Sequence, residues 1–441
     1  MRSDEPDEST MQVLILAMLV VATTFDYLSH GDPFGRFTVL PGAASYTSEI
    51  LSGVALAYVV LAGSRNRFRY VRAEYWLVFG VLVLMIALGV LANHVEAGAV
   101  FAGIRNYFRA LPWFFVPAVF AFSDSQVQTQ LRVLLVIAIL QLPLAVEQTL
   151  TTTSRGFGFT GDFTGGTLML SPTLSIFLVG ALCIMSAMRM RRLLPLWKFV
   201  VLFVLLVFPT MINETKATFI LLPLGLIFAY LAAARPDERL RAAVMSLGAA
   251  VVFLSVAVPI YDWMVKDRLY STPIAEFVTN PARLERYLWK KQDIGTTKEV
   301  GRVDAIIVSV REATADPLRV VFGLGIGTVS DSALGRGFAG RHFDVLGPFA
   351  KPSATKIMLE LGVVGLALVA SLMWLVFQDA RALARDRAGL MSALSAGWVG
   401  VIGVMAVSMI YVDVIAQTSL SYLFWYFAGL VAAHRMRCRL N

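Results

Sequence analysis

The stretch DPLRVVFGLGIGT at 316–328 has the composition of a loop that holds a phosphate through its backbone amides. Its three glycines, Gly323, Gly325 and Gly327, alternate with apolar residues. The stretch lacks the third glycine spacing and the downstream acid of a dinucleotide-binding fold, and it lacks the Lys-Ser/Thr pair of a P-loop. Two interpretations remain: a phosphate cradle, and a tight turn in which glycines permit positive φ or close backbone packing.

Basic residues around this stretch could bind a phosphate by charge. Arg302 begins a segment whose apolar positions predict an amphipathic helix, which Asp316-Pro317 would end. Arg319 lies inside the stretch, and Lys351 follows it. Arginine suits phosphate because it stays charged and donates bidentate hydrogen bonds, whereas lysine acts as a point charge.

Further candidates lie in other polar segments. Arg155 follows one apolar run, and Lys216 lies between two others, where a lysine usually extends its charge to the membrane surface. Arg286 belongs to the basic face of ARLERYLWKK (282–291), which predicts an amphipathic helix at the membrane interface.

The elements that must position these residues are membrane helices. Of the 441 residues, 57% are hydrophobic and 15% are charged, whereas a soluble domain has about 25% charged residues. The mean hydropathy is +0.70. About twelve apolar runs approach the roughly 17–25 residues that cross a bilayer. They are 11–28, 47–63, 75–93, 105–122, 131–148, 167–188, 197–212, 217–234, 243–264, 353–377, 390–411 and 414–433. The sequence therefore predicts an all-α, polytopic integral membrane protein.

Arginine and lysine set the orientation of such a protein, because cytoplasmic loops carry the excess of positive charge. When the chain crosses the membrane at each of these runs, the segments rich in Arg and Lys all lie on the same side of the membrane: 64–72, 189–198, 234–241, 380–387 and 434–441. That side is the cytoplasm, so both termini are expected there. Cys183 and Cys438 lie at or near this reducing side and are too few for a disulfide framework.

One long polar segment divides the chain. Residues 1–264 hold the first nine predicted spans, residues 265–352 form an extracytoplasmic (periplasmic) loop between helices 9 and 10, and residues 353–441 hold the last three spans and a cytoplasmic tail. The glycine stretch then lies outside the cytoplasm, where no nucleotide pool exists. A nucleotide-binding role is therefore excluded.

The order of these features resembles the family of O-antigen ligases and Wzy-type O-antigen or exopolysaccharide polymerases, over about residues 150–370. The features are the Arg-headed helix, the DPL…GxGxG turn and a span that opens with LELGVVGL. Arg302 matches the arginine that opens the family's helix, and Arg155 matches its Arg-Gly-aromatic outer loop. Lys216 takes the cationic place in the family's Ser-Arg-Gly turn, and Lys351 stands where the family commonly has His-Asn.

The resemblance implies an enzyme of the bacterial inner (plasma) membrane that uses polyprenyl-diphosphate-linked glycans. A sugar hydroxyl attacks the anomeric carbon and the polyprenyl diphosphate leaves, so cations aimed at the leaving group lower the barrier. The residues implied for catalysis are Arg302, Lys216, Arg155, Lys351 and His342; those implied for substrate binding are Gly323, Gly325, Gly327, Arg319 and Arg286. The sequence has no D-x-D motif and no His/Cys cluster at ligand spacing, so we expect neither metal nor cofactor.

The missing histidine favours a polymerase of repeat units over a ligase to lipid A core, which stays the alternative. Lysine has a pKa of ~10.4, so Lys351 is expected as a charged ligand, with His342 or Asp344 activating the hydroxyl weakly. The expected partners are the lipid-linked oligosaccharide, the glycan acceptor, the bilayer and a chain-length regulator, and not nucleic acid.

Two other classes of protein fit the topology. One is a secondary transporter or flippase, although the sequence shows no internal repeat with broken helices at corresponding positions. The other is a different lipid-dependent glycosyltransferase fold, which would place acidic residues in the first outer loop, where Asp26 and Asp32 lie.

Overall fold

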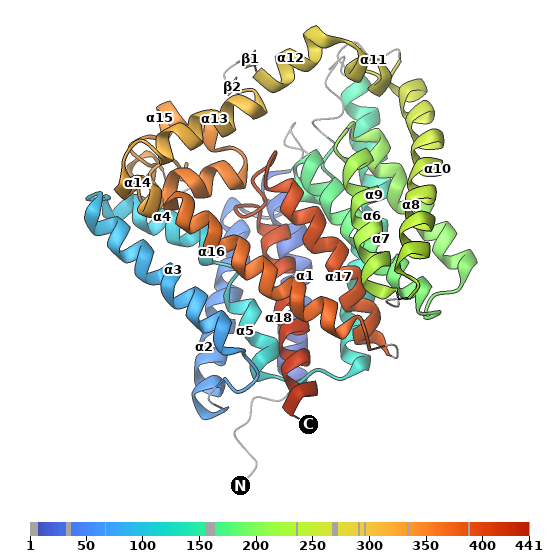
Figure 1. Cartoon of the computed structure of the whole chain (residues 1–441), viewed down its shortest axis with the longest axis horizontal. Coiled ribbons are helices and arrows are strands. Elements are labelled where there is room, and N and C mark those ends of the chain that lie inside the picture. Colours follow the sequence, from blue (N-terminus) through green and yellow to red (C-terminus); the bar gives the residue numbers. More distant parts are fainter. Residues whose placement is uncertain are drawn as a thin grey trace.

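A computed structural model describes residues 8–31, 37–66, 68–154, 164–234, 237–266, 272–289, 292–294, 297–332, 335–386 and 389–440. These residues fold almost wholly into helices, which confirms the all-α fold class (Figure 1). The long helices are α1 (Glu8–His30), α2 (Thr47–Asn66), α3 (Ala73–Ala92), α6 (Asp124–Ser154), α7 (Ser171–Met190), α8 (Leu196–Ile212), α9 (Thr218–Ala233), α10 (Arg239–Val265), α16 (Ser353–Leu383), α17 (Leu390–Ser408) and α18 (Thr418–Leu440).

Shorter elements connect them. They are α4 (Ala97–Phe108), α5 (Pro112–Val119), α11 (Ile274–Thr279), α12 (Pro281–Trp289), α13 (Arg302–Ala313), α14 (Pro317–Phe322) and α15 (Phe343–Leu346), with 3-10 turns at Gly42–Tyr46, Gly166–Leu168, Arg336–Phe338 and Gly347–Ala350. The strands β1 (Gln292–Ile294) and β2 (Thr297–Glu299) pair antiparallel, with Asp293 opposite Lys298.

Several helices have the length and composition of membrane spans. Among the described residues, eight helical segments qualify: Ser9–His30, Gly42–Ser64, Ala73–Ala92, Asp124–Thr152, Ser171–Met190, Arg239–Val265, Ser353–Leu383 and Leu390–Ser408. The helices α8 and α9 are apolar but shorter. On α10 only 17% of the most apolar window is buried, so its apolar surface has the character of a lipid-facing helix. A bilayer environment follows, whereas the count of about twelve spans stays a prediction.

The residues 105–122, expected as one span, form two short helices instead. The helix α4 ends at Phe108, and α5 begins at Pro112. Proline has no backbone N–H and therefore starts a helix more readily than it continues one. The turn between the two helices contains Arg109, which contacts other helices of the bundle.

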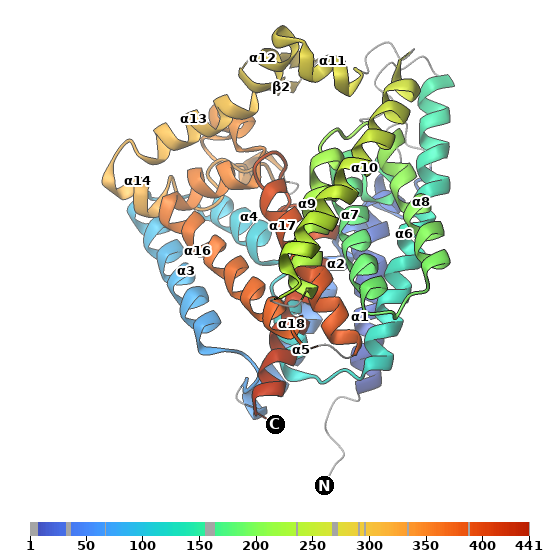
Figure 2. The ribbon, with the colours of Figure 1, turned by 45° about the vertical axis from the view of Figure 1, so that its right-hand side comes forward.

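The two ends of the bundle differ. The first residues of α1 and the last of α18 lie at one end, which we call the terminal end, whereas α11, α12 and the β1–β2 hairpin lie at the opposite end (Figures 1 and 2). We call α11 and α12 the arch. The predicted topology likewise places both chain termini on one side of the membrane and residues 265–352 on the other. Which end of the bundle lies on which side of the membrane stays a prediction.

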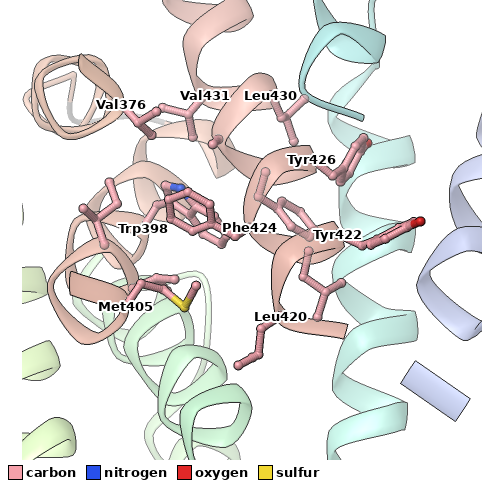
Figure 3. Close-up of a cluster of buried hydrophobic side chains, with 14 of the residues drawn as sticks. Val376, Trp398, Met405, Leu420, Tyr422, Phe424, Tyr426, Leu430 and Val431 are labelled. Atoms are coloured by element: carbon pink, nitrogen blue, oxygen red, sulfur yellow. The ribbon is translucent and has the colours of Figure 1, made fainter. Parts of the chain in front are cut away.

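The most buried helices are α7, α17 and α18, whose side chains belong to the main apolar core. Figure 3 shows side chains of α17 and α18 in this core, together with Val376 of α16. Trp398 of α17 stacks on Phe424 of α18, with ring centroids 5.9 Å apart. Glycine lets α17 approach its neighbours closely: a Cβ at Gly397 would lie 2.5 Å from the Cα of Ile184 on α7. Small residues at such contacts are typical of helix packing in membranes, because backbone approach replaces the missing hydrophobic driving force.

Candidate functional site

The glycine stretch fits into a break in α16. At Gly362 the backbone is non-helical (φ 73°, ψ −176°), which frees carbonyl groups of the preceding turn. The Leu324 N–H donates to the Leu359 carbonyl at 2.7 Å, and the Gly325 N–H donates to the Glu360 carbonyl at 3.0 Å. A Cβ at Gly362 would lie 2.5 Å from a carbonyl oxygen of α14, so glycine is required for both conformation and space.

Other amides of the stretch also donate within the protein. Gly323 donates to the Arg319 carbonyl at 2.9 Å, and Thr328 donates to the Gly325 carbonyl at 3.3 Å. All three glycines have positive φ, and a Cβ at Gly327 would collide with the backbone of α4. This geometry favours the packing interpretation of Gly323, Gly325 and Gly327. Their role in binding phosphate stays a prediction.

The predicted helix with Arg302 at its start is confirmed as α13. Its predicted end is wrong in detail, because α13 ends at Ala313 and Asp316-Pro317 begins α14. Asp316 caps that helix by accepting a hydrogen bond from the Arg319 N–H at 2.9 Å. The segment around Arg286 is helical as expected and forms α12, while the side chain of Arg286 lies outside what the structure describes.

Two of the predicted cations meet at the arch. The Lys216 Nζ lies 5.4 Å from the centroid of the Phe277 ring on α11. The Arg302 guanidinium lies 5.9 Å from the centroid of the Tyr287 ring on α12. The two rings touch edge to face, with centroids 5.4 Å apart. One aromatic pair therefore carries both cations, although they are far apart in the chain; we call Lys216 and Arg302 the arch cations.

The site continues from the arch into the bundle. Tyr411, in the turn after α17, lies within electrostatic range of both Arg302 and Tyr287. Two residues further, Asp413 accepts hydrogen bonds from the Ser353 hydroxyl at 2.8 Å and from the Lys356 ammonium at 2.9 Å. The Lys356 side chain is only 11% exposed. A short path of polar groups thus leads from Arg302 to the start of α16.

A second group of charges adjoins this one. Glu49 of α2 accepts two hydrogen bonds from Arg105, at 2.9 and 2.5 Å, and one from Arg109 at 3.3 Å. Arg109 also donates to the Ala416 carbonyl and lies within electrostatic range of Lys356. We call Glu49, Arg105, Arg109, Lys356 and Asp413 the buried ion network.

Glu360 lies one helical turn beyond Lys356 and has no exposed surface. It accepts hydrogen bonds from the Val329 N–H at 3.1 Å and from the Ser330 hydroxyl at 2.8 Å. These contacts join the broken helix α16 to the segment that follows the glycine stretch. Buried carboxylates need such donors, because an unsatisfied buried charge costs several kcal/mol.

His342 lies apart from the arch cations. Arg341 Nε donates to its Nε2 at 3.2 Å, and Arg341 Nη2 donates to the Asn93 carbonyl at the end of α3. Partial burial, together with the positive charges of Arg341 and Arg319, lowers the pKa of His342 below its usual value. The imidazole is therefore neutral at pH 7, as a general base must be.

The other candidates are placed as follows. Arg319 pairs with Glu312 at 3.0 Å and with Asp316 at 3.1 Å, so its charge is balanced locally. Lys351 is exposed and comes directly before Pro352, the N-cap of α16. Arg155 lies outside the described residues. The structure therefore brings together Lys216 and Arg302, and places Arg319 and His342 as neighbours elsewhere.

Sequence reasoning missed the buried ion network. Its signal was present, because Arg105 and Arg109 are four residues apart in an apolar run, as are Lys356 and Glu360. Such spacing puts both charges on one helix face, and charges inside apolar helices face other protein groups and are functional by default.

The arrangement can bind a strongly anionic group through the charges of Lys216 and Arg302. Within the described ranges, no three His, Cys, Asp or Glu side chains gather in a way that could hold a metal ion. No protein-family model matches this chain, and no curated protein matches it.

Proposed function

We propose that this protein is a membrane glycosyltransferase that polymerises polyprenyl-diphosphate-linked glycan repeat units at the outer face of a bacterial inner membrane, for an O-antigen or an exopolysaccharide. The observation that carries the proposal is the meeting of Lys216 and Arg302 on one aromatic pair. Two cations from distant segments, each on one ring of the same aromatic pair, suit a ligand with two negatively charged phosphates.

In the proposed reaction, the acceptor hydroxyl forms a bond to the anomeric carbon of the donor sugar. The bond from that carbon to the diphosphate oxygen breaks, and the leaving diphosphate keeps the electron pair. The arch cations stabilise the charge that develops on this leaving group. The hydroxyl proton passes to a base or to the phosphate; His342, neutral at pH 7, is the histidine proposed for this role.

The proposal places the arch and the segment 265–352 outside the cytoplasm and counts about twelve spans. The alternation of the long helices and the position of the arch opposite both chain termini support this topology (Figure 2). A polymerase is preferred to a ligase because a lysine, Lys351, stands where the family commonly has a histidine.

The test compares Lys216→Ala and Arg302→Ala with the matched control Lys198→Ala. Lys198 stacks on Trp197 at the start of α8 at 5.4 Å, the same distance as between Lys216 and Phe277. With purified protein and a lipid-linked oligosaccharide, polymer formation should fall by about 10²–10³ in each of the first two variants, the cost of one lost transition-state contact. The control should keep wild-type activity. Normal polymer in both arch variants would refute the proposal.

One observation favours a transporter as the second candidate. The helix α16 is broken at Gly362, close to the buried Lys356 and Glu360, and broken helices at charged sites are typical of secondary transporters. Proteoliposomes separate the two functions: a transporter moves the lipid-linked glycan across the bilayer without changing its length, whereas a polymerase lengthens glycan that is supplied on one side only.

A further inference from the structure

Lys216 lies in the turn between α8 and α9, and the backbone of that turn is strained. Glu214 has a φ of 59°, in the left-handed region. This conformation is uncommon for residues other than glycine, because the Cβ approaches the following carbonyl oxygen. A residue stays in such a conformation only where the surrounding structure holds it there. The position of Lys216, two residues later, therefore depends on the contacts that hold this turn.

Asn213 supplies those contacts. It is the C-cap of α8 and is only 1% exposed. Its Oδ1 accepts a hydrogen bond from the Thr215 N–H at 3.1 Å, so the side chain bridges the strained residue. Its Nδ2 donates to the Ser171 carbonyl at 3.0 Å and to the Ser175 hydroxyl at 2.9 Å. One buried amide therefore closes the turn around Glu214 and fixes it to α7.

The turn is held on both sides. The two acceptors of the Asn213 amide belong to the first turns of α7, one of the most buried helices. In the other direction the chain continues directly into α9, where the Thr218 N–H donates to the Thr215 carbonyl at 3.0 Å. Thr215 is thus bonded to Asn213 through its N–H and to α9 through its carbonyl. Since Lys216 is the next residue, a change at Asn213 should move the backbone that carries the ammonium.

We infer that Asn213 is a positioning residue for the proposed transfer reaction: it holds the Lys216 ammonium over the Phe277 ring, where the leaving diphosphate would bind. The inference rests on the proposed function, because Asn213 is too buried to touch a substrate and acts only through the lysine. A cation that is fixed in place beforehand stabilises developing charge without reorganising during the reaction. A displacement of about 1 Å can therefore cost about 100-fold in rate.

The test is a double-mutant cycle on kcat/KM, measured with the purified full chain and a lipid-linked oligosaccharide. Asn213→Ala should lower kcat by about 10- to 100-fold and change KM by less than about threefold, since the lost contact acts in the transition state. Lys216→Ala should lower kcat/KM by about 10²–10³. The double variant should be no slower than Lys216→Ala, because the asparagine then has no cation to position. With a merely structural asparagine the two losses would multiply.

Gln130→Ala is the matched control for the loss of a buried amide. Gln130 has no exposed surface, donates to Gln12 at 2.7 Å and accepts from the Tyr426 hydroxyl at 2.7 Å. These contacts join α1, α6 and α18 and do not include the turn of Lys216. Any loss of activity in this control should therefore multiply with the loss in Lys216→Ala.

A second variant covers the case in which Asn213→Ala does not elute as a folded protein. Ser175→Ala removes one acceptor of the Asn213 amide. It should lower kcat by roughly 2- to 10-fold, the effect of one neutral hydrogen bond, and this loss should vanish in the Lys216→Ala background.

The outcomes separate the inference from the proposed function. Losses that multiply between Asn213→Ala and Lys216→Ala, or full activity in Asn213→Ala, would overturn the inference alone. Full activity in Lys216→Ala would also overturn it, and the proposed function falls as well if Arg302→Ala is equally active.

Discussion

Replacing Lys356 by methionine should destabilise the protein, because it leaves the Asp413 carboxylate without its ammonium partner. The two groups are 2.9 Å apart, and the Lys356 and Asp413 side chains are 11% and 19% exposed. With an effective dielectric constant of 20, the gross attraction is about 6 kcal/mol, and breaking such a pair costs a net of about 3–5 kcal/mol. Asp413 keeps the Ser353 hydroxyl and the Ala416 N–H as donors. We therefore expect the lower value, about 3 kcal/mol.

The assay is the rate of irreversible thermal unfolding of the full chain in one detergent, since kinetic stability is the measurable quantity for such proteins. A loss of about 3 kcal/mol accelerates unfolding by up to about 160-fold. The double variant Lys356→Met with Asp413→Asn should recover most of this loss, because neither charge is then left unpaired. As a control, Glu276→Gln breaks the exposed pair with Arg283 and should change stability by less than about 1 kcal/mol.

Equal instability of the single and double variants would refute the reasoning, because the loss would then arise from packing and not from the ion pair. The double variant also separates structure from function. If it is stable but makes no polymer, then the Lys356–Asp413 pair is needed for activity as well as for stability.

Four further outcomes are expected. Gly362→Ala should lower the yield of folded protein by steric conflict, since φ is 73° and the new Cβ would lie 2.5 Å from a carbonyl oxygen; normal yield and unfolding rate would contradict this. If His342 is the base, kcat/KM should rise with pH through a pKa below about 6.5 and then stay level, and His342→Gln should lose that acidic limb. Lys351→Arg should keep most activity and Lys351→His should not exceed the wild type, as measured with purified enzyme; loss of activity in Lys351→Arg, together with a basic-limb pKa that is present in the wild-type pH–rate profile and absent from that of the variant, would identify the lysine as the base. A cysteine at Ser332 should react with a membrane-impermeant reagent in intact cells, and reaction only after permeabilisation would reverse the topology.

Much of the fold follows from hydropathy alone. The apolar runs at 75–93, 167–188 and 390–411 correspond closely to α3, α7 and α17, because a helix that faces lipid or other helices needs a long uninterrupted apolar stretch. The run at 105–122 does not correspond to a single helix, because Pro112 starts a new helix there. Hydropathy cannot show such a break, since both short helices are apolar.

The site was harder to predict. Arg302 and Lys216 were identified by their segments, but nothing in the sequence indicates that Phe277 and Tyr287 bring them together, because that contact depends on how the arch folds over the bundle. Asp413 was not predicted, since its partner Lys356 lies on another helix. Pairings between helices depend on tertiary contacts that periodicity does not encode.

The break in α16 also bears on how the chain is made. In lipid, the carbonyl groups of Leu359 and Glu360 need donors, and those donors are the amides of Leu324 and Gly325. The donors precede α16 in the chain, so synthesis from the N-terminus delivers them before α16 emerges. The helix can therefore acquire its kink against a partner that is already present.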